Sequence, residues 1–232
     1  MMRVEIKMYD TGKTQQHRAK TKKIGMKYVK LAVLFGLLLC WKVIYLISQP
    51  LGDSWANFLA YCWIFSIMFL YLKVTKQTLA KFFYSISMKL VLNGIGLGIL
   101  LFVSGGIGYF LSQKVFGLSL SQEATQVFGK APEYLWLFPL TIILTIISEE
   151  ILFRGIFLKE LNRDLTAFGA IPISALFFSL FHLSSFNAIS SFVYGIGLAE
   201  VTLRTGSLWP AFIGHFVVNL TGIVMFILIN IS

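Results

Sequence analysis

Two adjacent glutamates and an arginine lie within an apolar run of the chain, the stretch TIISEEILFRGIF at residues 145–157. Residues four apart share one face of a helix, so Glu150 and Arg154 are predicted to form an ion pair, in the favourable order with the acid first. Glu149 lies about 100° around the helix from Glu150 and has no such partner nearby. We therefore expect the carboxylate of Glu149 to be available for chemistry.

The four-residue spacing recurs twice later in the chain. Phe178 and His182 are four apart in FSLFH, and His215 and Asn219 are four apart in HFVVN. An imidazole and a carboxamide on one buried stripe can bind a water, a carbonyl or a developing oxyanion. The third histidine of the chain, His17, lies in the basic N-terminal segment and is not a candidate.

Each group also has a purely structural explanation. The charges of SEEILFR could form a buried ion-pair cluster, and His182 could be a hydrogen-bonded core histidine. His215 and Asn219 could join helices to one another, as polar side chains do in membrane bundles. An acid, two imidazoles and an amide at similar depth in the membrane are more than such contacts require, and they favour a site.

The composition indicates what must position these groups. The 232 residues are 57% hydrophobic and 13% charged, with a mean hydropathy of +0.78, which excludes a soluble globular protein. Runs of about 20 apolar residues recur, the length at which a helix crosses a bilayer. The predicted fold is all-α, a polytopic membrane helix bundle. Seven transmembrane helices are expected, at about 31–48, 56–72, 90–112, 135–158, 166–183, 187–203 and 208–230.

The basic residues indicate a membrane orientation and not nucleic-acid binding. Nine of the 20 Lys and Arg lie in the first 30 residues, directly before the first apolar run. Further Lys and Arg fall between the second and third runs, after the fourth and after the sixth, whereas the connector 49–55 has none. The positive-inside rule then predicts a multi-pass cell-membrane protein with a cytoplasmic N-terminus. The polar segment 113–134 is expected to be external and to contain an interfacial helix.

The candidate residues have similar predicted depths. With a rise of about 1.5 Å per residue from the cytoplasmic turns, Glu149, His182, His215 and Asn219 fall in one slab roughly 14 Å thick. Antiparallel helices would bring them together.

The motifs EEILFR, FSLFH and HFVVN together resemble the CPBP family of intramembrane proteases, also called the Abi family. Its members are type II CAAX prenyl proteases and bacteriocin-processing or bacteriocin-immunity proteases. The resemblance covers about residues 130–225. Together with the charge and hydropathy pattern, it divides the chain into a basic cytoplasmic segment at 1–30, three transmembrane helices over 31–112 and a CPBP-like catalytic core at 130–230. Prenyl proteases typically have eight spans, so an eighth helix is the alternative to seven.

The resemblance implies peptide-bond hydrolysis within the membrane. Glu149 would activate the attacking water, helped by His182, and His215 and Asn219 would donate to the oxyanion. Glu150 would stay paired with Arg154, and Phe178 would support the site. A carboxylate in a medium of low dielectric binds a proton more readily, which suits a general base.

The expected partners are the lipid bilayer and a peptide or protein substrate in or at the membrane. The family is often described as metal-dependent, and one glutamate with two histidines could bind zinc. No HExxH motif occurs, and HFVVN offers a carboxamide, which is a poor zinc ligand. We therefore favour a glutamate-activated water without an obligate metal, with zinc as the alternative.

Two functions of other classes remain open at this point. The chain could be a non-catalytic immunity protein that sequesters a bacteriocin in the bilayer. It could also be a proton-coupled transporter that uses Glu149 and His182 as a relay, although no inverted repeat is evident.

Overall fold

The structure is a computed structural model, and it describes residues 33–34, 36–37, 39–83, 85–116, 137–182 and 188–231. The chain divides into two units, Met1–Cys40 and Trp41–Ser232. In the first unit the few described residues are mostly helical. The predicted basic segment 1–30 and most of the predicted external segment 113–134 lie outside the described residues.

Every regular element in the described part of the second unit is helical, which confirms the all-α prediction. The elements are α2 (Trp41–Ser48), η1 (Gln49–Leu51), α3 (Asp53–Val74), η2 (Leu79–Lys81), α4 (Met88–Phe116), α6 (Leu137–Glu149), η4 (Glu150–Leu158), α7 (Lys159–Asp164), α8 (Ala167–Leu180), α9 (Ala188–Thr205) and α10 (Trp209–Ile231). The connections from α7 to α8 and from α9 to α10 take only a few residues, so these helices are antiparallel neighbours.

Two helices in the described ranges are long and apolar enough to cross a membrane by themselves. They are Trp55–Val74 in α3 and Met88–Ile107 in α4. The helix that contains the candidate glutamates continues to Asp164, beyond the predicted end at residue 158. The number of spans therefore stays a prediction, while the described ranges form a helical bundle with two helices that could cross a membrane by length and composition.

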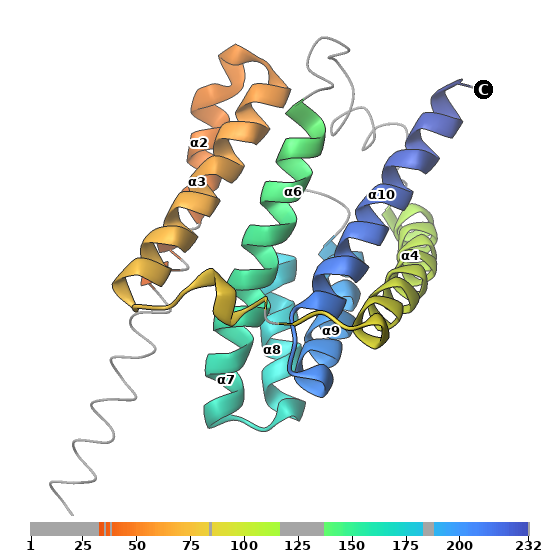
Figure 1. The fold of residues 1–232 in the computed structure, drawn as a ribbon. Coiled ribbons are helices and arrows are strands. Elements are labelled where there is room, and N and C mark those ends of the chain that lie inside the picture. Colours follow the sequence, from red (N-terminus) through yellow and green to blue (C-terminus); the bar gives the residue numbers. More distant parts are fainter. Residues whose placement is uncertain are drawn as a thin grey trace, which may run out of the picture. The chain divides into compact units, whose positions relative to one another are not determined.

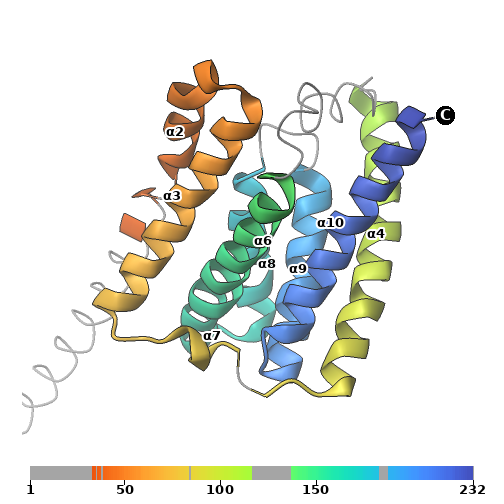
Figure 2. The same cartoon turned by 45° about the horizontal axis from the view of Figure 1, so that its top comes forward.

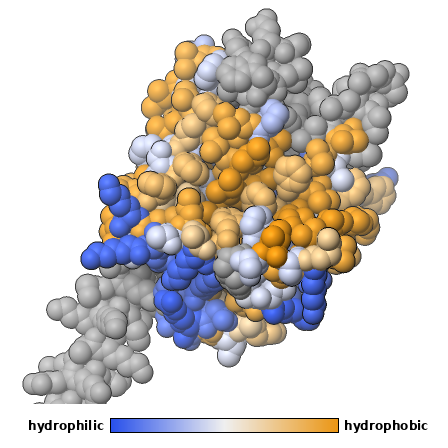
Figure 3. Space-filling model, viewed as in Figure 1, coloured by the Kyte–Doolittle hydropathy of each residue, from blue (hydrophilic) through white to orange (hydrophobic). Residues whose placement is uncertain are grey.

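Exposed apolar side chains cover much of the visible face of the second unit, and hydrophilic side chains gather at one end of it (Figure 3). That end holds the α3–α4 connection and the turns after α7 and α9. Its exposed cations are Lys73, Lys76, Lys81, Lys89, Arg163 and Arg204. Cations collected at one end of an apolar bundle are typical of the cytoplasmic side of a membrane protein.

Elements α6, η4 and α7 form one continuous helix of residues 137–164, and its middle part is a π-helix (Figure 1). It packs against α3 on one side and α10 on another, and η4 also contacts α8 and α9 (Figure 2). Eight of the nine side chains of the π-helical segment are buried. The helix with the candidate acids is thus surrounded by protein.

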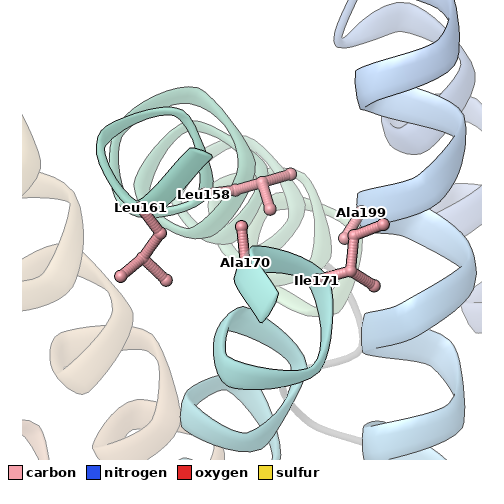
Figure 4. Packing of buried hydrophobic residues seen from close by; sticks show 5 residues of the cluster. All are labelled: Leu158, Leu161, Ala170, Ile171 and Ala199. Carbon is pink, nitrogen blue, oxygen red and sulfur yellow. The ribbon is translucent and has the colours of Figure 1, made fainter. Parts of the chain in front are cut away.

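C-terminal to the acids, small and branched side chains pack this helix against its neighbours. The cluster shown in Figure 4 joins Leu158 of η4 and Leu161 of α7 to Ala170 and Ile171 of α8 and Ala199 of α9. Two of its five members are alanines, so the helices approach closely. Such packing leaves little freedom for the acidic end of the helix to shift.

Helices α4 and α10 meet along a glycine seam, the surface formed by Gly94 and Gly98. A Cβ placed on Gly98 would lie 2.6 Å from Cβ of Val217, and one on Gly94 would lie 2.7 Å from Cβ of Ile213. These glycines are four apart, the GxxxG spacing that lets two membrane helices come into close contact. The seam therefore sets the position of α10, the helix of His215.

We expect Gly98→Ala to destabilise the protein, because the new methyl group would collide with Val217 in the seam. The expected cost is about 1–3 kcal/mol, as for other overpacked sites. The matched control is Gly96→Ala on the same helix, where a Cβ would have no neighbour within 4 Å. Thermal unfolding in detergent micelles measures both, and equal midpoints for the two variants would contradict the close approach.

Candidate active site

Glu149 and Glu150 lie where the α-helical hydrogen bonding of α6 changes to the π-helical bonding of η4. Both side chains are buried, with 5% of Glu149 and none of Glu150 exposed. Insertions of π-helix within α-helices are often found at functional sites, because they change the direction in which successive side chains point. Here the two adjacent acids approach different nitrogens of the same histidine, His215.

Glu150 connects two helices through one oxygen atom. Its Oε1 accepts a hydrogen bond from Nη1 of Arg154 at 3.1 Å and is 2.7 Å from Nδ1 of His215 on α10. The ion pair predicted between Glu150 and Arg154 is therefore present. The bond to His215 was not predicted, since it joins residues 65 positions apart.

Phe178 of α8 is a common platform for the charged groups. The guanidinium of Arg154 lies over its ring at 4.2 Å, an arrangement that stabilises a desolvated cation. The imidazoles of His182 and His215 contact the same ring, with centroid distances of 4.8 and 6.1 Å. Phe178 itself is 2% exposed. Both predicted histidines are thus brought to one side chain.

The bond to Glu150 determines which nitrogen of His215 is free to react. A carboxylate paired with a guanidinium only accepts hydrogen bonds, so Nδ1 of His215 must be the donor. In the neutral ring Nε2 then has no hydrogen and is an acceptor. This Nε2 is 3.9 Å from Oε2 of Glu149. A neutral ring of this tautomer has no hydrogen on Nε2 to donate, whereas a protonated ring donates from both nitrogens.

His182 is held in a similar way by its own helix. Its Nδ1 is 2.9 Å from the carbonyl oxygen of Phe178, which can only accept, so Nδ1 is again the donor. The side chain is half-buried. Phe178, at one turn's distance, separates His182 from Arg154.

Asn219 lies one helical turn beyond His215 on α10, about 6 Å further along the axis. Its side chain is half-buried, and no hydrogen bond of its carboxamide to other described residues is found. The structure therefore places Asn219 on the same face as His215 without joining it to the acids.

Other buried polar atoms near Glu149 retain hydrogen-bonding capacity. Within the described residues no partner is found for Oε2 of Glu149, Oε2 of Glu150 or Oγ of Ser148. Buried polar groups of this kind are normally satisfied by a water or a ligand, since leaving them unpaired costs about 1–3 kcal/mol each. Ser148 was not among the predicted site residues, although its position beside Glu149 was a signal for it.

A tyrosine from the first half of the chain also lies near these groups, and no sequence motif indicated it. The hydroxyl of Tyr61 on α3 shares a hydrogen bond with Thr145, and Tyr61 interacts electrostatically with Glu149. The only signal in the sequence was a hydroxyl group within an otherwise apolar run.

The described residues do not form a zinc site. No group of three or more His, Cys, Asp or Glu side chains in the described ranges could hold a metal ion. Zinc in proteins needs three or four such donors. Here Glu149 approaches Nε2 of His215 at 3.9 Å, while Nδ1 of the same ring is bonded to Glu150.

Comparison with known families adds independent information. Residues 131–221 of the 232 match the family model described as type II CAAX prenyl endopeptidase Rce1-like. This segment contains α6, η4, α7, α8, α9 and the part of α10 with His215 and Asn219. No curated protein and no solved structure matches the chain.

We expect Glu150→Leu or Arg154→Leu alone to cost about 3–5 kcal/mol of stability, because each leaves the other charge buried without its partner. The double variant should be more stable than either single variant. Thermal unfolding of all four proteins measures the coupling between the two residues. Additive losses would contradict the buried ion pair.

Proposed function

We propose that this chain is an intramembrane endopeptidase that uses Glu149 to activate water, because residues 131–221 match the family model described as type II CAAX prenyl endopeptidase Rce1-like. The main supporting observation is the pair of acceptors, Oε2 of Glu149 and Nε2 of His215, 3.9 Å apart and buried. One water molecule can donate a hydrogen bond of about 2.8 Å to each of them.

The two acceptors would orient the water for attack. With one hydrogen directed to Glu149 and the other to His215, a lone pair of the water oxygen points away from both, towards a bound carbonyl carbon. Glu149 takes the first proton as the oxygen attacks, and a tetrahedral oxyanion forms. The proton then passes to the peptide nitrogen, the C–N bond breaks, and a carboxylate and an amine leave.

Glu150 has a positioning role in this mechanism. Its hydrogen bond fixes the tautomer and the ring direction of His215, as the buried carboxylate does in other histidine sites. Arg154 compensates the charge of Glu150 and is itself held against Phe178. We assign Asn219 as a donor to the oxyanion and His182 as a second acceptor near the substrate.

The surroundings of the site favour a substrate from the membrane. Apolar side chains are exposed along α3 and α4, and the cations lie at one end of the unit (Figure 3). We infer that the substrate is a membrane-associated peptide or protein, lipidated or of the bacteriocin-precursor type, and that the cation-rich end faces the cytoplasm.

The test is Glu149→Gln, which keeps the size of the side chain and removes the base. Cleavage should fall by about 10²–10⁴-fold, the usual contribution of a general base. Mass spectrometry of membrane peptides from cells with the wild type and with the variant would show new peptide ends that depend on Glu149. The purified proteins are then compared in liposomes on the peptide with the largest difference.

The matched control is Glu200→Gln. Glu200 is a half-exposed glutamate that pairs with Arg204 near the end of α9. It should leave cleavage within about twofold of wild type.

Bacteriocin immunity retained by Glu149→Gln would favour sequestration over proteolysis, and flux that depends on a pH gradient would favour transport.

A further inference from the structure

We infer that Tyr61, from the half of the chain outside the family-matched segment, donates a hydrogen bond to the substrate carbonyl as it becomes an oxyanion. This inference rests on the proposed proteolysis and adds a residue to it.

The first argument is position. Helix α3 packs directly along α6, and the two lie side by side in both views of the fold (Figures 1 and 2). Tyr61 shares a hydrogen bond with Thr145, which is one helical turn before Glu149 and on the same face of α6. Tyr61 also interacts electrostatically with Glu149. The phenol therefore lies near the face of α6 that carries this carboxylate.

The second argument is the balance of donors and acceptors. Glu149 only accepts, and both neutral imidazoles have their hydrogens on Nδ1, directed at Glu150 and at the Phe178 carbonyl. The side chains that orient the water thus offer no hydrogen to the oxyanion. Neutral donors have to come from other residues, and a phenol is a good one in a site of low dielectric.

The third argument is that the ring of Tyr61 is fixed by packing while its hydroxyl hydrogen can still rotate. Its ring stacks on Trp41 of α2, with centroids 6.4 Å apart and planes at 19°. The hydroxyl of Thr145 already donates to the Thr141 carbonyl at 2.8 Å, so Tyr61 must be the donor in its bond to Thr145. A rotation about the C–O bond would move this hydrogen to a charged acceptor, which forms the stronger bond.

The role of a donor predicts an effect on the rate and not on substrate affinity. Tyr61→Phe removes the hydroxyl and keeps the ring on Trp41. We expect kcat to fall about 10²-fold with KM within about threefold, because the bond forms only in the transition state. Thr145→Val should lower kcat less, since the phenol remains but is less well placed. The assay uses the purified proteins in liposomes and the peptide identified with Glu149→Gln.

Tyr71→Phe is the matched control, a tyrosine on the same helix ten residues later and about 15 Å along the axis. It should keep the wild-type kcat. A merely structural Tyr61 would lower the unfolding midpoint and leave kcat of the folded fraction unchanged, which would overturn the inference. Full activity of Tyr61→Phe beside an inactive Glu149→Gln would overturn it too, and leave the protease intact. Full activity of Glu149→Gln would instead refute the proposed function.

Discussion

Burying a carboxylate among apolar helices is costly, and Glu150 meets this cost with two partners from different parts of the chain. Arg154 of the same helix supplies the opposite charge, and His215 of α10 supplies a second hydrogen bond to the same oxygen. Removing Arg154 would leave the charge of Glu150 without compensation in a medium that stabilises charges poorly, and removing His215 would take away one of its hydrogen bonds. The distance between α10 and the central helix is therefore constrained by electrostatics as well as by packing.

The same interaction links structure to chemistry. A histidine without a partner could turn and could hold its proton on either nitrogen, whereas His215 has one orientation and one tautomer while Glu150 holds it. Phe178 reinforces this arrangement, because its ring contacts the guanidinium and both imidazoles at once. Aromatic neighbours Phe153 and Phe181 pack edge-on, with Phe153 against both Phe178 and Phe181. The acids and histidines thus lie against a rigid apolar wall that keeps their polar atoms directed at each other.

The sequence predicts much of this fold, because hydropathy alone decides where helices cross an apolar medium. The predicted segments 166–183, 187–203 and 208–230 match α8, α9 and α10 within a few residues. The ion pair of Glu150 and Arg154 follows from helical spacing alone. Features that join distant residues were not predictable in this way. The bond from Glu150 to His215, the tautomers and the contact of Tyr61 with α6 all depend on which helices become neighbours, and the π-helix depends on how the backbone accommodates them.

Helix α10 packs on α4 through glycines and branched side chains, and α4 thereby sets its position along the axis. The branched side chains of α10 fit against the glycine backbone of α4. A small shift of α10 along its axis would move these side chains against larger residues of α4. A slip by a single turn would displace His215 by about 5.4 Å, about twice the length of its bond to Glu150. Helix α4 carries no reactive group, yet it determines where His215 lies relative to Glu150. Exchanging α4 for another apolar helix of equal length would keep a helix able to cross the membrane and would displace His215 from the acids.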